Sequence, residues 1–226
     1  MSFPDNALEI ARSAMEEINP NLVDPYTTVI DFLSTNPEFA PKATKTAPLG
    51  SSAYIEKLAQ RFSDGRATKQ LKPPQTIQDP IISVILGSHG NYSADQLQQM
   101  QAAHSLAMGA ENLTGDLLED YIAENAEPAG WVQCSGYTTK KADFIKRSDD
   151  GSNSWTILQI KNRDNSENSA SRSVREGTEI QKWHRSFAKK EGFNWHRFPD
   201  EQVAEKMSEE GFQKFVIQQI STSSKI

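Results

Sequence analysis

The sequence predicts an α/β protein with a central mixed β-sheet flanked by helices and with a helical N-terminal subdomain. Two observations lead to this class. Apolar residues recur at helical spacing through residues 1–85, whereas short β-branched and aromatic runs, separated by turn residues, follow Pro128. The chain has 226 residues, which is enough to bury a sizeable core. We therefore expect a helical subdomain over residues 1–85 and an α/β core over residues 86–226.

Three helices are expected in the N-terminal subdomain. The first has Asp5 as a candidate N-cap, and the third begins at a serine and ends at Gly65. Residues 72–80 form a linker, because their two adjacent prolines fit neither a helix interior nor a central strand. Residues 80–128 predict a buried segment, a glycine-containing turn and further helices. The three N-terminal helices are expected at residues 4–19, 24–37 and 51–65.

The region after Pro128 predicts a β-hairpin followed by a basic segment. The loop SDDGSNS joins two of three expected strands as an antiparallel hairpin. Residues 169–190 predict a polar loop that passes into a basic helix, with Ile180, Trp183 and Phe187 on one face. Near the C-terminus, FQKFVIQQIS fits either a strand or a helix. The three strands are expected at residues 131–137, 142–147 and 155–163.

The composition excludes several classes of protein. No apolar run reaches the roughly 18 residues of a membrane span, and the N-terminus lacks the continuous apolar stretch of a secretory signal. The single Cys134 excludes an internal disulfide framework and a multi-thiolate metal site. The four histidines show no HxxxH or HExxH spacing, which argues against a zinc site. The expected location is the cytoplasm.

The charges are distributed unevenly along the chain. Residues 139–190 hold twelve Lys or Arg and seven Asp or Glu, a net charge of +5. The remainder holds twelve bases and twenty-three acids, so its net charge is −11. A basic segment on an acidic body is typical of a phosphate-binding surface, and chance clustering on solvated faces gives the same pattern. The charge alone therefore does not choose between these interpretations.

The predicted hairpin gathers groups that suit a divalent cation. Side chains alternate along a strand, so Gln159 and Lys161 share one face while Leu158 and Ile160 point to the other, apolar face. Asp143 lies on the partner strand and is expected beside them. Carboxylate and amide oxygens are ligands that Mg²⁺ accepts, together with water and substrate phosphate. The ammonium would orient water or stabilise charge on the phosphate.

This arrangement resembles the PD-(D/E)xK nucleases, whose motif is an acid on one strand and acid-x-Lys on the next. Asp143 matches the first acid and Lys161 the lysine. The sequence departs from the motif twice, because Ala142 replaces its proline and Gln159 replaces its second acid. An amide oxygen ligates a metal more weakly than a carboxylate does, so another acid is expected to compensate.

The segment ENLTGDLLEDYIAE resembles the first core helix of these nucleases, which often supplies a glutamate to the metal site. Glu119 lies at the border of the apolar face of this helix, whereas Asp116 and Asp120 lie further toward solvent. The resemblance therefore implies that Glu119 completes the metal ligands with Asp143 and Gln159. The alternative is that Glu119 is one acid among several on an exposed helix face.

A more specific resemblance covers residues 112–198. The stretches KNRDNSENSASRSVREGTEIQKWHRSF and FNWHRFP resemble type II restriction endonucleases of the SinI kind. That resemblance implies a restriction-endonuclease-like core and Mg²⁺-dependent cleavage of double-stranded DNA at GG(A/T)CC by a homodimer. It implies no membrane partner, and a cognate DNA methyltransferase enters as a genetic partner only. Two alternatives stay open: a repair or structure-specific nuclease of the same superfamily, and a catalytically degenerate DNA-binding protein.

Polar side chains suited to DNA follow the catalytic strand. Arginine that binds guanine O6 and N7 is the commonest base-specific contact, and lysines and arginines beyond it suit phosphates. The alternative is a polar loop followed by a solvated basic helix. The candidates for base or phosphate contact are Arg163, Asp164, Asn165, Asn168, Arg172 and Arg175, with Lys182 and Arg185 as phosphate contacts.

Overall fold

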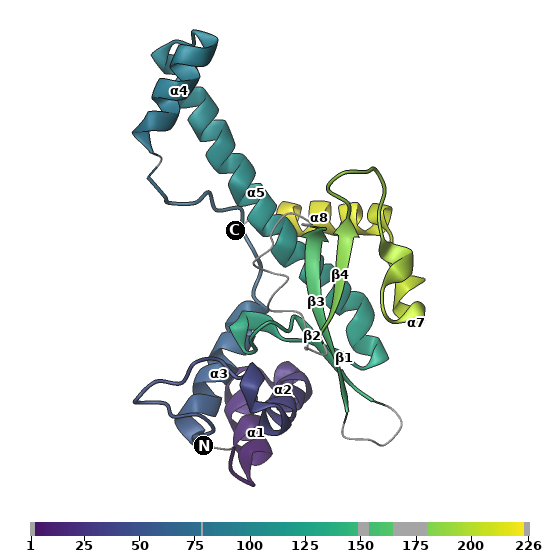
Figure 1. Cartoon of the computed structure of the whole chain (residues 1–226). Coiled ribbons are helices and arrows are strands. Elements are labelled where there is room, and N and C mark those ends of the chain that lie inside the picture. Colours follow the sequence, from purple (N-terminus) through teal and green to yellow (C-terminus); the bar gives the residue numbers. More distant parts are fainter. Residues whose placement is uncertain (1–2, 78, 149–153, 165–179, 224–226) are drawn as a thin grey trace.

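The computed structural model describes residues 3–77, 79–148, 154–164 and 180–223. A four-stranded mixed sheet lies between a helical N-terminal body and a set of core helices, so the predicted α/β class is confirmed (Figure 1). The helices are α1 Ala7–Ile18, α2 Val23–Thr35, α3 Ser52–Gly65, α4 Pro80–Gly90, α5 Ala94–Ala126, α7 Glu201–Ala204 and α8 Glu209–Ser223. The strands are β1 Trp131–Gln133, β2 Phe144–Arg147, β3 Trp155–Arg163 and β4 Ile180–Ser186.

Helices α1 to α3 form the predicted N-terminal helical body. The hydroxyl of Ser51 caps α3 by accepting a hydrogen bond from the backbone N–H of Tyr54, at 3.2 Å. The division of the chain at residue 85 remains a prediction, and that position lies inside α4. None of the helices in the described ranges is both long and apolar enough to cross a membrane.

Residues 80–126 depart from the expected arrangement. The apolar run at residues 81–86 was expected to be buried, but it lies on α4, which buries no residue. The following segment is one helix, α5, of 33 residues. A capping box starts it, since Ser93 and Gln96 each bind the backbone N–H of the other. Helix α4 and the first half of α5 project from the rest of the molecule (Figure 1).

The sheet has the strand order β1-β2-β3-β4. Strands β1, β2 and β3 are antiparallel neighbours, which confirms the predicted hairpin, and β4 runs parallel to β3. The basic helix predicted at the end of residues 169–190 is wrong, because residues 180–186 form β4. Both faces of β4 are covered: Ile180 packs against one core and Trp183 against the other. The resulting three-residue spacing of apolar side chains imitates a helix.

Two hydrophobic cores lie on opposite faces of the sheet. Val132, Ile145 and Ile157 pack with α1, α2 and α3, whereas Leu158 and Ile160 pack with α5 and the C-terminal elements. The predicted alternation along β3 is therefore confirmed, although its second face is also covered. The C-terminal segment left open between strand and helix is part of α8.

Candidate active site

Asp143 is fixed at the point where β1, β2 and β3 meet. Its backbone N–H donates to the carbonyl of Leu158 at 2.9 Å, and its own carbonyl accepts from the N–H of Cys134 at 2.8 Å. Its carboxylate Oδ2 accepts from the backbone N–H of Ile160 at 2.7 Å. The carboxylate is thus held at the stretch of β3 that lies between Gln159 and Lys161.

Helix α5 brings a second carboxylate, Glu119, to the same place. Glu119 and Asp143 line one pocket of about 320 Å³. Burial raises the pKa of Glu119 from 4.5 to about 8, and the charge of Asp143 is the next largest cause. The ammonium of Lys161 acts in the opposite direction on the same pKa. The structure therefore brings together three predicted residues, Glu119, Asp143 and Lys161.

The electrostatics of this cluster favour a bound cation. Burial also raises the pKa of Asp143, although the N–H of Ile160 and the charge of Lys161 both lower it. Two partly desolvated carboxylates with raised pKa values repel each other and bind protons more readily than free acids do. A divalent cation would relieve this repulsion, so the carboxylate pair fits an ion such as Mg²⁺.

Among the described residues, the further ligands of such a cation come from donors other than a third acid, imidazole or thiolate. Within the described ranges, no three side chains of His, Cys, Asp or Glu converge closely enough to hold a metal by themselves. Gln159 lies two residues before Lys161 on the same face of β3, and its neighbour in the parallel register is Lys182. An amide oxygen, water and phosphate are the donors available beside the two acids.

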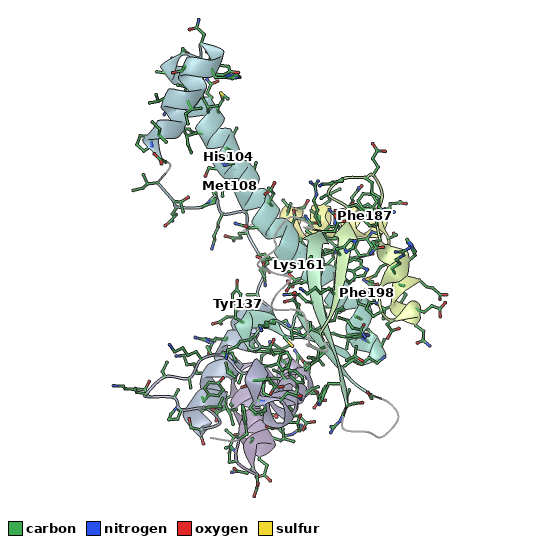
Figure 2. All side chains as sticks on the ribbon, in the orientation of Figure 1. His104, Met108, Tyr137, Lys161, Phe187 and Phe198 are labelled. Atoms are coloured by element: carbon green, nitrogen blue, oxygen red, sulfur yellow. The ribbon has the colours of Figure 1, made fainter. Side chains whose placement is uncertain are left out.

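Lys161 is exposed near the end of β3 and pairs in register with His184 on β4. Figure 2 shows it within the central part of the molecule, between the N-terminal body and the projecting part of α5. Its charge acts on the pKa of both acids while its side chain is open to solvent, as a group that contacts a large substrate must be.

The rest of the pocket comes from residues that the sequence did not assign to the site. Gly65, Lys69 and the short 3₁₀ turn η4, Ser135–Tyr137, line the pocket together with Asp116 and Asp120. Gly136 has φ +67°, and a Cβ at that position would meet the backbone carbonyl of Arg61 at 1.8 Å. This close approach joins α3 to the loop that leads into Asp143.

Tyr137 lies on this loop and is 89% exposed, with φ +55°. Its ring is among the most exposed large side chains of the described chain, and it stands at the pocket that holds Glu119 and Asp143 (Figure 2). The pair Lys140 and Lys141 follows it, and both are exposed. An aromatic residue and two lysines shortly before Asp143 were the available sequence signal.

Comparison with known proteins identifies the family. A model of the SinI restriction endonuclease family matches residues 7–222. The chain belongs to the SinI restriction endonuclease family. The type II restriction enzyme Eco47I of Escherichia coli is 41% identical over 218 residues, which cover 95% of this chain and 94% of that protein. The type II restriction enzyme SinI of Salmonella infantis is 41% identical over 217 residues, with the same coverage. The resemblance seen in residues 112–198 is confirmed and extends across the chain.

The DNA-contact candidates of this family member fall into two groups. Arg163 is exposed at the end of β3. Asp164 accepts a hydrogen bond from the backbone N–H of Ala188 through its carboxylate, so it holds the turn after β4. The other four predicted residues of this segment, Asn165, Asn168, Arg172 and Arg175, lie outside the described residues.

Lys182 and Arg185 lie on β4 and not on the expected helix, and they point to opposite faces of the sheet. Lys182 pairs with Gln159 and shares the face of Lys161. Arg185 points to the α8 side, where its guanidinium binds Glu209 at 2.6 Å and the amide oxygen of Asn162 at 2.9 Å. Its charge is therefore paired within the protein. Lys182 is the stronger of the two candidates for phosphate because it shares the face of Lys161.

Proposed function

We propose that the chain is a type II restriction endonuclease that cleaves double-stranded DNA at GG(A/T)CC with Mg²⁺, as a homodimer in the cytoplasm. The cognate methyltransferase would protect the same site and enters only as a genetic partner. The observation that carries the proposal is the convergence of Glu119, Asp143 and Lys161 in a chain of the SinI restriction endonuclease family. The recognition sequence is carried over from the family resemblance.

The residues of the pocket suit phosphodiester hydrolysis. Asp143 and Glu119 would hold Mg²⁺, and the amide oxygen of Gln159 is a third candidate ligand. When bound, Mg²⁺ supplies positive charge that stabilises the phosphorane-like transition state and favours ionised water. Lys161 would orient the attacking water and offset the negative charge that grows on the phosphate oxygens. In-line attack on phosphorus then expels the 3′ oxygen and leaves a 5′ phosphate.

Recognition would use the basic side chains at the same end of the sheet. Arg163 is an exposed candidate for a guanine, and each good bidentate contact discriminates by about 1–3 kcal/mol. Lys182 would contact a phosphate, which positions the duplex without reading its sequence. Arg172 and Arg175 remain proposed guanine readers, with Asn165 and Asn168 beside them.

The test is digestion of a plasmid that carries GG(A/T)CC sites, followed by run-off sequencing of the ends. Discrete fragments that end within GG(A/T)CC are expected with Mg²⁺, and none with EDTA. Fragments without sequence preference would indicate a repair or structure-specific nuclease. Binding of duplex without cleavage would indicate a degenerate DNA-binding protein. Lys161→Ala should abolish the fragments, whereas Lys206→Ala, at an exposed lysine that follows α7, should not.

A further inference from the structure

The projecting pair of helices has an apolar surface that nothing in the described chain covers. It comprises α4 and residues 94–108 of α5, here called the helical arm (Figure 1). On α4, Val84 is 60% exposed and Ile85 is 59% exposed. On α5, Leu106 is 50% exposed, and Met108, which Figure 2 marks together with His104, is 39% exposed.

The helical arm is well formed although its surface is apolar. The side-chain amide of Gln101 on α5 donates to the hydroxyl of Ser83 on α4 at 2.6 Å. The arm ends at Gly109, where the backbone of Lys72 and Pro73 lies so close to α5 that a Cβ would meet the Lys72 carbonyl at 2.9 Å. Gly109 is the first buried residue of α5, so the helical arm forms no part of the hydrophobic cores of the described chain.

The small number of charged residues on this surface indicates what kind of partner it binds. Asp95 is the only Asp, Glu, Lys or Arg in residues 80–110. A surface without a lysine or arginine cannot track the phosphates of DNA. An exposed apolar patch of this kind marks a protein–protein interface in a soluble protein.

We propose that the helical arm is the homodimer interface, and that it packs against the helical arm of a second copy around a two-fold axis. In such an interface identical surfaces meet, so any charge faces its own copy or a near neighbour. A surface with one charge in 31 residues meets an identical copy without like-charge repulsion, and its isoleucine, valine, leucine and methionine side chains fill a four-helix interface.

The position of the arm also relates the interface to catalysis. Helix α5 runs without a break from the arm to Glu119, eleven residues after Met108, or about 16 Å along the axis. A two-fold axis at the arm would therefore set the separation of the two catalytic pockets through one rigid helix in each copy. This consequence rests on the proposed function, since cleavage of both strands at a near-palindromic site needs two related pockets.

The test is the oligomeric state of the full chain, measured by sedimentation velocity without DNA or Mg²⁺. The wild type is expected to be a dimer at micromolar concentration. The double variant Val84→Glu, Ile85→Glu should weaken the dimer at least 100-fold, with unchanged helical circular dichroism, because both side chains are exposed in the single chain. Ile217→Glu, at a 67% exposed position on α8, is the matched control and should leave the dimer intact.

Two variants of opposite charge at one position test the assignment of the dimer interface more specifically. Ile85→Glu and Ile85→Lys should each be monomeric alone, and their equimolar mixture should form a heterodimer. A monomeric wild type, or a Val84→Glu, Ile85→Glu variant that dimerises like the wild type, would overturn the proposal. These measurements do not involve DNA cleavage, so a chain that fails to cut GG(A/T)CC still tests the interface.

Discussion

Two charged clusters are built around side chains on opposite faces of β3 and β4, and they differ in how their charges are paired. Lys161 lies on one face, where Asp143 and the carboxylate of Glu119 from α5 meet it; these three residues are the proposed catalytic group, here called the catalytic cluster. On the other, Arg185 binds Glu209 at 2.6 Å and Asn162 at 2.9 Å, here called the Arg185 cluster. Both clusters contain partly buried carboxylates and both join a strand to a helix, so burial of the acids alone does not explain their difference.

The Arg185 cluster is complete within the protein. Each charge has a partner of opposite sign, and the guanidinium also lies over the rings of Phe193, at 5.4 Å, and Phe212, at 5.1 Å. The catalytic cluster has two acids near one lysine, and burial raises the pKa of both acids. A set of charges that is left unbalanced in the fold is the signature of a site that binds something else.

Removing the lysine of the catalytic cluster should have the largest effect on activity. We predict that Lys161→Ala lowers the single-turnover cleavage rate by at least 10²–10³-fold, the usual effect of deleting one group that stabilises transition-state charge. The free energy of unfolding should change by less than about 1 kcal/mol, because Lys161 is exposed. Rapid-quench cleavage and urea unfolding measure the two quantities. Unchanged cleavage would remove Lys161 from the catalytic assignment.

Disrupting the Arg185 cluster should do the reverse. Arg185→Met leaves Glu209 partly buried without its cation, and we predict a loss of about 3 kcal/mol in the free energy of unfolding. The folded fraction should cleave DNA within a few-fold of the wild-type rate. Urea unfolding and cleavage below the unfolding midpoint test this. If cleavage fell as far as in Lys161→Ala while stability held, Arg185 would belong to the DNA contacts.

The pairing of β2 with β3 could be predicted because its sequence signals are local. The turn residues of the loop fix the β2–β3 hairpin, and alternation along β3 separates Lys161 from Leu158 without any tertiary information. The strand β4 could not be predicted in this way. Its faces meet two different cores, so Trp183 is buried on one face while Ile180 is partly buried on the other, and the two-residue period disappears.

The outer parts of the site depend on contacts between distant segments. At Gly65 and Gly136 two backbone segments lie in direct contact. The sequence around either glycine looks like that of an ordinary turn, so it does not indicate this contact. Residues 81–86 of the helical arm were expected in the core because their composition is that of a core. An apolar segment indicates that a surface will be covered, but not whether the same chain covers it.

The raised pKa of Glu119 predicts a stability that depends on pH. The folded chain keeps a proton up to about pH 8 that the unfolded chain loses near pH 4.5. Without metal, the contribution of Glu119 to the free energy of unfolding should therefore be largest below about pH 4.5. This contribution should fall as the pH rises to about 8. We expect a loss on the order of 2 kcal/mol after solvent screening, measured by urea unfolding in EDTA.

Two controls relate this slope to the catalytic cluster. Glu119→Gln cannot ionise, so its stability should vary less over the same pH range, whereas Arg185→Met should keep the wild-type slope from a lower starting value. Mg²⁺ should stabilise the wild type more at pH 8 than at pH 5.5, because it competes with the proton for the carboxylates. A wild-type stability that rises between these pH values would contradict the raised pKa.

The smallest expected effect tests which face of the sheet meets DNA. Lys182 shares the face of the catalytic cluster, three residues before Arg185 on β4. We predict that Lys182→Ala weakens binding of any duplex a few-fold and lowers the slope of log K against log salt by about 1, as loss of one phosphate contact does. Fluorescence anisotropy in Ca²⁺ or EDTA at several salt concentrations measures this without cleavage. Lys206→Ala should leave the slope unchanged. Equal slopes for wild type and Lys182→Ala would mean that the duplex approaches the cluster from the side of Tyr137 and Lys141 and does not reach β4.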